Sequence, residues 1–202
     1  MFVQVIRGRV TDPTGLRAAL DRWAEELGPG ATGWLGSTAG VTDDGEFVAT
    51  ARFDSEEAAR RNSDRSEQGQ WWERTSKLFT GEVTFVDGTD VDVDVTGDPN
   101  LAGFVQVIQG RTSNPGRARE LMAQDPEAWA TYRPDVLGSL TIPQEGDDYT
   151  VVLYFRSEAE AREGERKEPP AEIAGQMEEM RALEVGDPVF LDLKDPWLLT
   201  PR

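Results

Sequence analysis

The chain has 202 residues, of which 38% are hydrophobic, and a formal charge of −17 at pH 7. This length allows one large domain or two small ones. So acidic a protein repels nucleic-acid phosphates and anionic lipid surfaces, which makes both poor partners. Cysteine and histidine are absent, which excludes disulfides, thiolate catalysis, Ser-His-Asp triads and the commonest zinc and haem ligand.

The start of the chain is predicted to be a strand. Residues 2–10 are rich in valine and isoleucine and are preceded by no basic segment, which is not the pattern of a signal peptide. No run of eighteen apolar residues occurs, so no membrane span is expected. We therefore expect a cytoplasmic protein.

A helix and two strands are expected next. Asp12 offers an N-cap and Pro13 occupies the first helical position. Leu16, Leu20, Trp23 and Leu27 then recur at spacings of three and four, which predicts one helix face, and the glycines of Gly28–Gly30 end the helix. Strands are predicted at 33–40 and 46–53, joined by a short turn.

A second helical region and a last strand complete the first half. Asp54 and Glu57 suggest a capping box at the start of this region. Its apolar face is formed by Trp71, Trp72, Thr75, Leu78 and Phe79. Valines alternate with aspartates at 90–95, which predicts a strand.

The second half repeats the first. The segment Phe2–Ile6 (Phe-Val-Gln-Val-Ile) recurs as Phe104–Ile108, 102 positions later, and further matches follow without a gap. The repeat assigns residues 1–96 to a first domain, 97–103 to a linker and 104–202 to a second domain.

The same local signals recur in the second half. Asn114 is expected to cap its first helix, and Asp125 with the following proline to break that helix in two. Ser157 and Glu160 form the second capping box.

The element order predicts an α+β fold. Strand, helix, strand, strand, helix, strand is the ferredoxin-like βαββαβ unit, whose helices cover one face of a four-stranded antiparallel sheet. Phe2 and Ile6 point to one face of the first strand, and Val3 and Val5 to the other. A strand that is apolar on both sides is buried on both. We therefore predict two fused ferredoxin-like repeats whose antiparallel sheets face each other in an intrachain dimeric α/β barrel.

Several segments resemble one superfamily. The opening Phe-Val-Gln-Val-Ile strand, the segment Arg52–Ala58, the Asn62–Asp64 turn and the Trp71-Trp72 pair are similar to antibiotic-biosynthesis-monooxygenase domains of the dimeric α/β-barrel superfamily. The resemblance implies a cofactor-independent monooxygenase, or a related isomerase, acting on a small aromatic or polyketide-like compound. The alternative is a non-catalytic small-molecule-binding or stress-related protein. The chain would act as a pseudo-dimer, alone or as a homodimer.

The resemblance also implies a pocket in the first repeat. It assigns catalysis to Asn62 and Trp72, with Trp71, Arg65 and Gln68 binding the substrate. A tryptophan can stack on a flat ring, and an amide or guanidinium can donate to an oxyanion. The alternative is that the tryptophans are core residues and Asn62 is a helix C-cap. The second repeat has Gly164 at the position of Asn62, so we expect one working pocket.

Three strand residues are further candidates for the pocket. Gln4 and its counterpart Gln106 could face a ligand, or they could bond each other or the backbone between the repeats. Trp34 is expected to share a strand face with Gly36, which could leave room for a ring. Arg52 stands where the second repeat has a tyrosine, and it could meet an acidic partner or point into a cavity.

No metal or cofactor is expected. The aspartates between 87 and 94 lack a calcium-loop pattern and fit a solvated strand edge better. The Gly28–Gly30 cluster ends a helix, so it is not a dinucleotide fingerprint. Haem handling would have to use a tyrosine, from the set Tyr132, Tyr149 and Tyr154.

Overall fold

The computed structural model describes residues 1–201 and divides into two compact units. One unit contains Met1–Val91 together with the C-terminal segment from Asp195, and the other contains Asp92–Lys194. Within the described residues the fold is α+β, with two five-stranded antiparallel sheets and seven α-helices. The predicted pair of ferredoxin-like repeats is confirmed.

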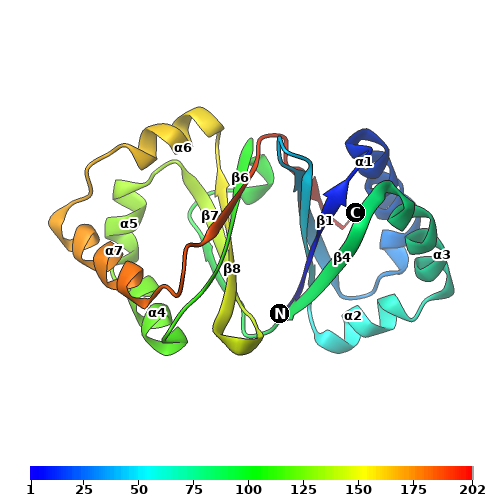
Figure 1. Cartoon of the computed structure of the whole chain (residues 1–202), viewed down its shortest axis with the longest axis horizontal. Coiled ribbons are helices and arrows are strands. Elements are labelled where there is room, and N and C mark those ends of the chain that lie inside the picture. Colours follow the sequence, from blue (N-terminus) through cyan, green and yellow to red (C-terminus); the bar gives the residue numbers. More distant parts are fainter. Residues whose placement is uncertain (202) are drawn as a thin grey trace. The chain divides into compact units, whose positions relative to one another are not determined.

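The sheet of the first unit has the strand order β10-β2-β3-β1-β4. These strands are β1 (Phe2–Val10), β2 (Trp34–Val41), β3 (Glu46–Phe53), β4 (Phe79–Gly88) and β10 (Trp197–Leu199). Helices α1 (Pro13–Arg22), α2 (Glu56–Ser63) and α3 (Ser66–Thr75) lie on one face of this sheet (Figure 1). A π-helical turn, Trp23–Leu27, continues α1, and 3-10 turns follow at Gly28–Gly30 and Ser76–Leu78.

The caps explain where these helices begin. The Asp12 carboxylate accepts a hydrogen bond from the Gly15 amide at the start of α1, as predicted. The N-cap of α2 is Ser55, whose hydroxyl accepts from the Ala58 amide. The predicted box on Asp54 and Glu57 is thus wrong by one residue.

The sheet of the second unit has the strand order β5-β7-β8-β6-β9. These strands are β5 (Asp92–Val95), β6 (Phe104–Arg111), β7 (Val136–Pro143), β8 (Asp148–Phe155) and β9 (Val189–Leu193). Its helices are α4 (Pro115–Met122), α5 (Pro126–Tyr132), α6 (Glu158–Glu165) and α7 (Ala171–Leu183). Short 3-10 turns occur at Pro99–Leu101 and Glu145–Asp147.

The predicted signals of the second repeat are confirmed. The Asn114 and Ser157 side chains cap α4 and α6. The break between α4 and α5 lies at Asp125, whose φ of 48° is in the left-handed region. A left-handed residue cannot continue a right-handed helix, and the proline after it starts the next one.

The sheets differ from the prediction in having five strands instead of four. The fifth strand of each sheet comes from the other sequence repeat: β5 pairs with β7, and β10 pairs with β2. Strand β4 was also missed. Phe79 continues the spacing of the apolar residues in the second helical region, so it was assigned to the apolar face of that helix. Phe79 instead begins β4 and packs edge-on against Phe47.

Strand β1 has buried residues on both faces of the first sheet, as predicted. Phe2 belongs to the helix-side core, which also holds Trp23 and Phe53. Val3 and Val5 point to the helix-free face and are 0% and 2% exposed. The closed barrel that would cover this face stays a prediction. No helix within residues 1–201 is long and apolar enough to cross a membrane.

Candidate functional site

Four tryptophans of the first unit form a continuous row of rings. The ring centroids of Trp34 and Trp23 are 4.9 Å apart, those of Trp23 and Trp71 6.4 Å, and those of Trp71 and Trp72 6.2 Å. The row therefore connects the end of the first helical region to β2 and α3, and it brings together three of the predicted site residues.

Three of these indoles are fixed by hydrogen bonds. The Nε1 of Trp23 donates to Gln68 Oε1 at 2.6 Å, that of Trp34 to Ser37 Oγ at 3.0 Å, and that of Trp71 to the Ala19 carbonyl at 3.1 Å. Buried indoles usually need such partners. Trp34 is thus part of the buried core, and the half-buried Trp71 and Gln68 pack against it.

Trp72 is different from the other three. It is half-buried, and its Nε1 finds no hydrogen-bond partner within residues 1–201. Its ring packs at 6.0 Å from Phe79 and at 5.2 Å from Phe85, which is 45% exposed. We call Trp72, Phe79 and Phe85 the aromatic patch. It is apolar, open to solvent, and carries one unused donor.

Asn62 and Arg65 are bonded to each other and not to the aromatic patch. Asn62 is 7% exposed, and its Oδ1 accepts from Arg65 Nη1 at 3.1 Å. The same Nη1 donates to the Leu27 carbonyl at 3.0 Å, and the guanidinium pairs with Glu67. The pair ties α2 to the end of the first helical region. The C-cap of α2 is Asp64, so Asn62 is not the cap that the alternative interpretation expected.

Gln4 and Gln106 have equivalent partners that neither interpretation anticipated. Each amide lies on the helix side of its sheet and donates, at 2.9 Å, to an aspartate on the neighbouring edge strand. The acceptors are Asp87 for Gln4 and Asp192 for Gln106. The two glutamines therefore bond neither each other nor the backbone.

Arg52 lies on the helix-free face of β3. It forms no ion pair with any described residue, and its buried Nε has no hydrogen-bond partner. Two residues earlier on the same face, the buried Thr50 hydroxyl also has none. The acidic partner considered for Arg52 is thus not observed.

A bulge in β2 corrects the expectation for Trp34. Trp34 pairs with Phe53 and Gly36 pairs with Arg52, so the two β2 residues lie on opposite faces of the sheet. Gly36 has a φ of 126°, and a Cβ there would lie 2.8 Å from Arg52 Nη2. The space at Gly36 is therefore filled by the guanidinium and not by a ring.

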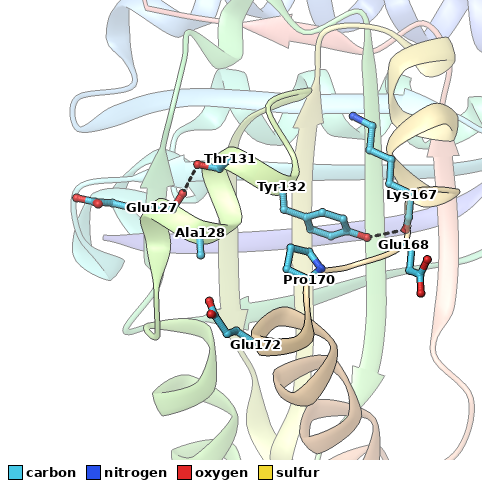
Figure 2. A pocket seen from close by; sticks show the side chains of 8 residues that line it. All are labelled: Glu127, Ala128, Thr131, Tyr132, Lys167, Glu168, Pro170 and Glu172. Carbon is cyan, nitrogen blue, oxygen red and sulfur yellow. Dashed lines mark hydrogen bonds between the residues drawn. The ribbon is translucent and has the colours of Figure 1, made fainter.

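The second unit has an open pocket of about 720 Å³ between α5, the α6–α7 loop and the start of α7 (Figure 2). Its walls combine the Tyr132 ring and Pro170 with the charged side chains of Lys167, Glu168 and Glu172. The Tyr132 hydroxyl donates to the Lys167 carbonyl at 3.0 Å. This pocket was not predicted from the sequence.

The repeat positions show why the first unit is filled at this place. Tyr132 and Lys167 correspond to Gly30 and Arg65. A Cβ on Gly30 would lie 2.6 Å from Arg65 Nη2. The Tyr132 side chain, at the position of Gly30, would occupy the space that the Arg65 guanidinium fills in the first unit. The second unit therefore has no residue at position 167 with the contacts of Arg65.

Among residues 1–201 no group of three acidic side chains is arranged to hold a metal ion. Asp92, one of the aspartates considered for calcium, accepts a hydrogen bond from Arg119 at 2.6 Å. Burial raises the pKa of Tyr149 above its usual range, and its hydrogen bond to Glu184 adds to that shift.

Solved structures share this fold along almost the whole chain. A Lactobacillus acidophilus protein provisionally named a monooxygenase superposes with a TM-score of 0.73 at 12% identity, covering 98% of this chain and 95% of its own. A Fusobacterium nucleatum protein with the same provisional name has a TM-score of 0.76 at 10% identity, covering 98% and 94%. The chain therefore shares with these proteins a fold of two ferredoxin-like repeats in tandem.

A third structure with this fold is an anthrone oxidase-like protein, with a TM-score of 0.66 at 12% identity over 98% of this chain and 93% of its own. No family model matches the sequence, and no curated protein matches it either. The likeness therefore establishes the fold and not an activity.

Proposed function

We propose that the chain binds a small aromatic or polyketide-like compound at the first unit and acts on it as a cofactor-independent monooxygenase or a related isomerase. The observation that carries this proposal is the aromatic patch. Trp72 presents a ring and a free Nε1 donor, beside the exposed Phe85. Stacking and one hydrogen bond suit a flat, oxygenated ring.

The proposed chemistry needs no resident redox group. A hydroxylated anthracenone loses a proton to form an enolate, which reduces dioxygen directly at the methylene carbon. Loss of water from the resulting peroxide converts the methylene to a carbonyl, so one dioxygen gives one quinone and one water. The protein docks the ring and stabilises the negative oxygen.

Trp72 is the proposed donor to the substrate oxygen. Asn62 and Arg65 would support it indirectly, because their polar atoms are bonded to each other and to the Leu27 carbonyl. These bonds hold α2 in place next to α3, which carries Trp72. Trp71 and Gln68 would likewise position α3 through their bonds to the first helical region.

The second candidate is a non-catalytic protein that binds the same class of compound. It is favoured by the commitment of Arg65, since the Nη1 of this expected oxyanion donor already donates to Asn62 Oδ1 and to the Leu27 carbonyl. Such a protein would bind a flat ring on the aromatic patch and release it unchanged.

Oxygen consumption with a dihydroxyanthracenone separates these candidates. Under the first, dioxygen uptake and quinone formation are stoichiometric, and Trp72→Ala lowers kcat/KM at least about tenfold, the effect of losing one stacking contact and one hydrogen bond. Tryptophan quenching without oxygen uptake would favour the binder.

A matched pair of variants controls for surface effects. Phe85 and Phe190 are exposed on equivalent edge strands, opposite Ile6 and Ile108. Only Phe85 has a tryptophan beside it. Phe85→Ala should impair turnover or binding, whereas Phe190→Ala should not. Equal effects of both variants would contradict a site at the aromatic patch.

A further inference from the structure

The pocket of the second unit has the volume of a small-molecule site. It measures about 720 Å³, and pockets that take small ligands span roughly 300–1,000 Å³. Helix α5, the α6–α7 loop and the start of α7 form its walls (Figure 2). All of these segments belong to the second unit, so the pocket is complete within that unit.

The charged groups around the pocket are mainly acidic. The acidic members are Glu127, Glu168 and Glu172. None of their carboxylates has an ion-pair or hydrogen-bond partner within residues 1–201. By contrast, Glu158 and Glu165 of the neighbouring α6 both pair with Arg162. Three carboxylates against the one ammonium of Lys167 leave an excess of two negative charges, which attracts a cation.

The Tyr132 ring is the fixed part of the wall. Its hydroxyl donates to the Lys167 carbonyl at 3.0 Å, and its ring meets Trp129 edge-on, with the centroids 6.0 Å apart. The Trp129 Nε1 in turn donates to Gln176 Oε1 of α7 at 2.6 Å. Because the hydroxyl proton is already donated, Tyr132 offers a ligand its aromatic face. Such a face attracts a cation that lies within about 6 Å of the ring centroid.

The three carboxylates are spread around the pocket and do not converge on one point. They come from different walls, with Glu127 on α5, Glu168 on the loop and Glu172 on α7 (Figure 2). A metal ion needs oxygen ligands that meet at one centre, and no three acidic residues of the described chain are arranged in that way. Separated charges around an aromatic ring suit a larger, organic cation.

The first unit supplies its own cation at the equivalent position. Arg65, which corresponds to Lys167, pairs with Glu67 and donates to the Leu27 carbonyl. The Lys167 ammonium makes no ion pair with any residue that the structure describes, and it extends away from Glu172 (Figure 2). The fold can therefore fill this place with a guanidinium of its own, and the second repeat leaves it without one.

We propose that this pocket binds a small organic cation, in which an ammonium or guanidinium group is attached to an apolar or aromatic body. The cationic group lies against the Tyr132 ring and interacts with the carboxylates of Glu168 and Glu172. The apolar body contacts Ala128 and Pro170, which line the same pocket. Binding at this site is a property of the second unit and requires no turnover at the aromatic patch.

The test uses benzylamine as the probe, with benzyl alcohol as the uncharged comparison, in calorimetric titrations of the full chain. Benzylamine should bind, and benzyl alcohol should bind much more weakly. Joint Glu168→Gln and Glu172→Gln substitutions should weaken benzylamine binding about three- to tenfold, the effect of losing two exposed charge contacts. Joint Glu145→Gln and Glu178→Gln substitutions remove the same charge from exposed positions outside the pocket, so they should leave binding unchanged.

Variants of Tyr132 test the role of the ring. Tyr132→Leu removes the aromatic face and should weaken benzylamine binding about threefold or more, whereas Tyr132→Phe keeps the face and should bind within about twofold of the native chain. Thermal unfolding accompanies each titration. The glutamine variants should keep the native Tm, because the carboxylates that they remove have no partner among residues 1–201.

Two results would overturn the proposal. If benzylamine bound no better than benzyl alcohol, the pocket would not recognise a cation. If the two pairs of glutamine substitutions weakened binding equally, the net charge of the chain would explain the affinity and the pocket would not. A loss of binding in the pocket variants alone, at an unchanged Tm, would support the proposed site.

Discussion

The two units share the order of their strands and helical regions, and a serine caps α2 and α6 alike, but they fill the space beside these two helices differently. In the first unit, Arg65 follows α2 in the sequence, and its guanidinium donates to the Asn62 side chain. In the second, Arg133 reaches this space from the loop before β7, pairs with Asp135 at 2.7 Å and donates to the Ala161 carbonyl. The fold places a guanidinium beside α2 and α6 alike, but from different positions in the repeat.

A second interaction recurs in the same way. Trp23 donates to Gln68 in the first unit, and Trp129 donates to Gln176 in the second, each at 2.6 Å. These residues are not 102 positions apart, so alignment of the repeats does not reveal them. Duplicated domains can thus keep a contact while changing the residues that make it.

The largest effect is expected when the residue of one unit is placed at the same repeat position of the other. Gly164→Asn introduces the residue of position 62, but a Cβ there would lie 2.5 Å from Arg133 Nε and 2.8 Å from Asp135 Oδ2. We expect the free energy of unfolding to fall by about 3 kcal/mol or more, because a buried ion pair must move. Urea unfolding measures this loss.

Gly175→Asn is the control for that substitution. Gly175 lies within α7, and a Cβ there would meet nothing within 4 Å. Asparagine has a slightly better helix propensity than glycine, so the control should be neutral or weakly stabilising. A similar loss at both positions would show that the Arg133–Asp135 pair does not decide the outcome.

The two Trp–Gln bonds should differ in strength. Gln68→Met leaves the buried Trp23 Nε1 without an acceptor and should cost about 2 kcal/mol, whereas Gln176→Met should cost about 1 kcal/mol because water can reach the half-buried Trp129. Gln70→Met, at an exposed position of α3, should change little. If Gln176→Met lowered the free energy of unfolding more than Gln68→Met, the burial of the two indoles would not decide the cost of losing the acceptor.

The serine caps should be equivalent in the two units. Ser55→Ala and Ser157→Ala each remove an acceptor for one amide at the start of the second helix. Each should lower the free energy of unfolding by about 1 kcal/mol. A difference between them well above about 0.5 kcal/mol would mean that the two helix starts are not interchangeable.

Tyr149 sharpens the comparison at high pH, because the first unit has Phe47 at this position. The pKa of Tyr149 is raised in the folded state, by burial and by Glu184. The unfolded chain therefore loses this proton first, and stability falls as the pH rises above about 10. Tyr149→Phe should reduce that fall, as followed by unfolding from pH 7 to 11. An unchanged pH dependence would contradict this assignment.

Local signals predicted much of this fold. Asp12, Asn114 and Ser157 act as caps, and Asp125 breaks a helix, because these effects depend on a few adjacent residues. Strand β4 was missed because Phe79 fits the helix period as well as the strand. The partners of β5 and β10 could not be predicted, since such short strands are placed by tertiary pairing.

The candidate site was harder to predict than the fold. The sequence indicated Trp72 and Arg52, but it could not show that one indole is unbonded while three others are fixed. The bulge in β2 places Gly36 opposite Arg52 and leaves space for its guanidinium. A single glycine in a predicted strand does not show that a bulge is present or which face the following side chains take. Side-chain partners of this kind depend on contacts between distant segments.

The placement of β10 has a consequence for synthesis on the ribosome. The first sheet reaches its final width only when Trp197–Leu199 pair with β2, long after β2 itself has been made. At translation rates of about 5–20 residues per second, the roughly 155 intervening residues take about 8–31 s. During that interval β2 is an open edge, so nascent chains are most exposed to mispairing with one another before their last strand emerges.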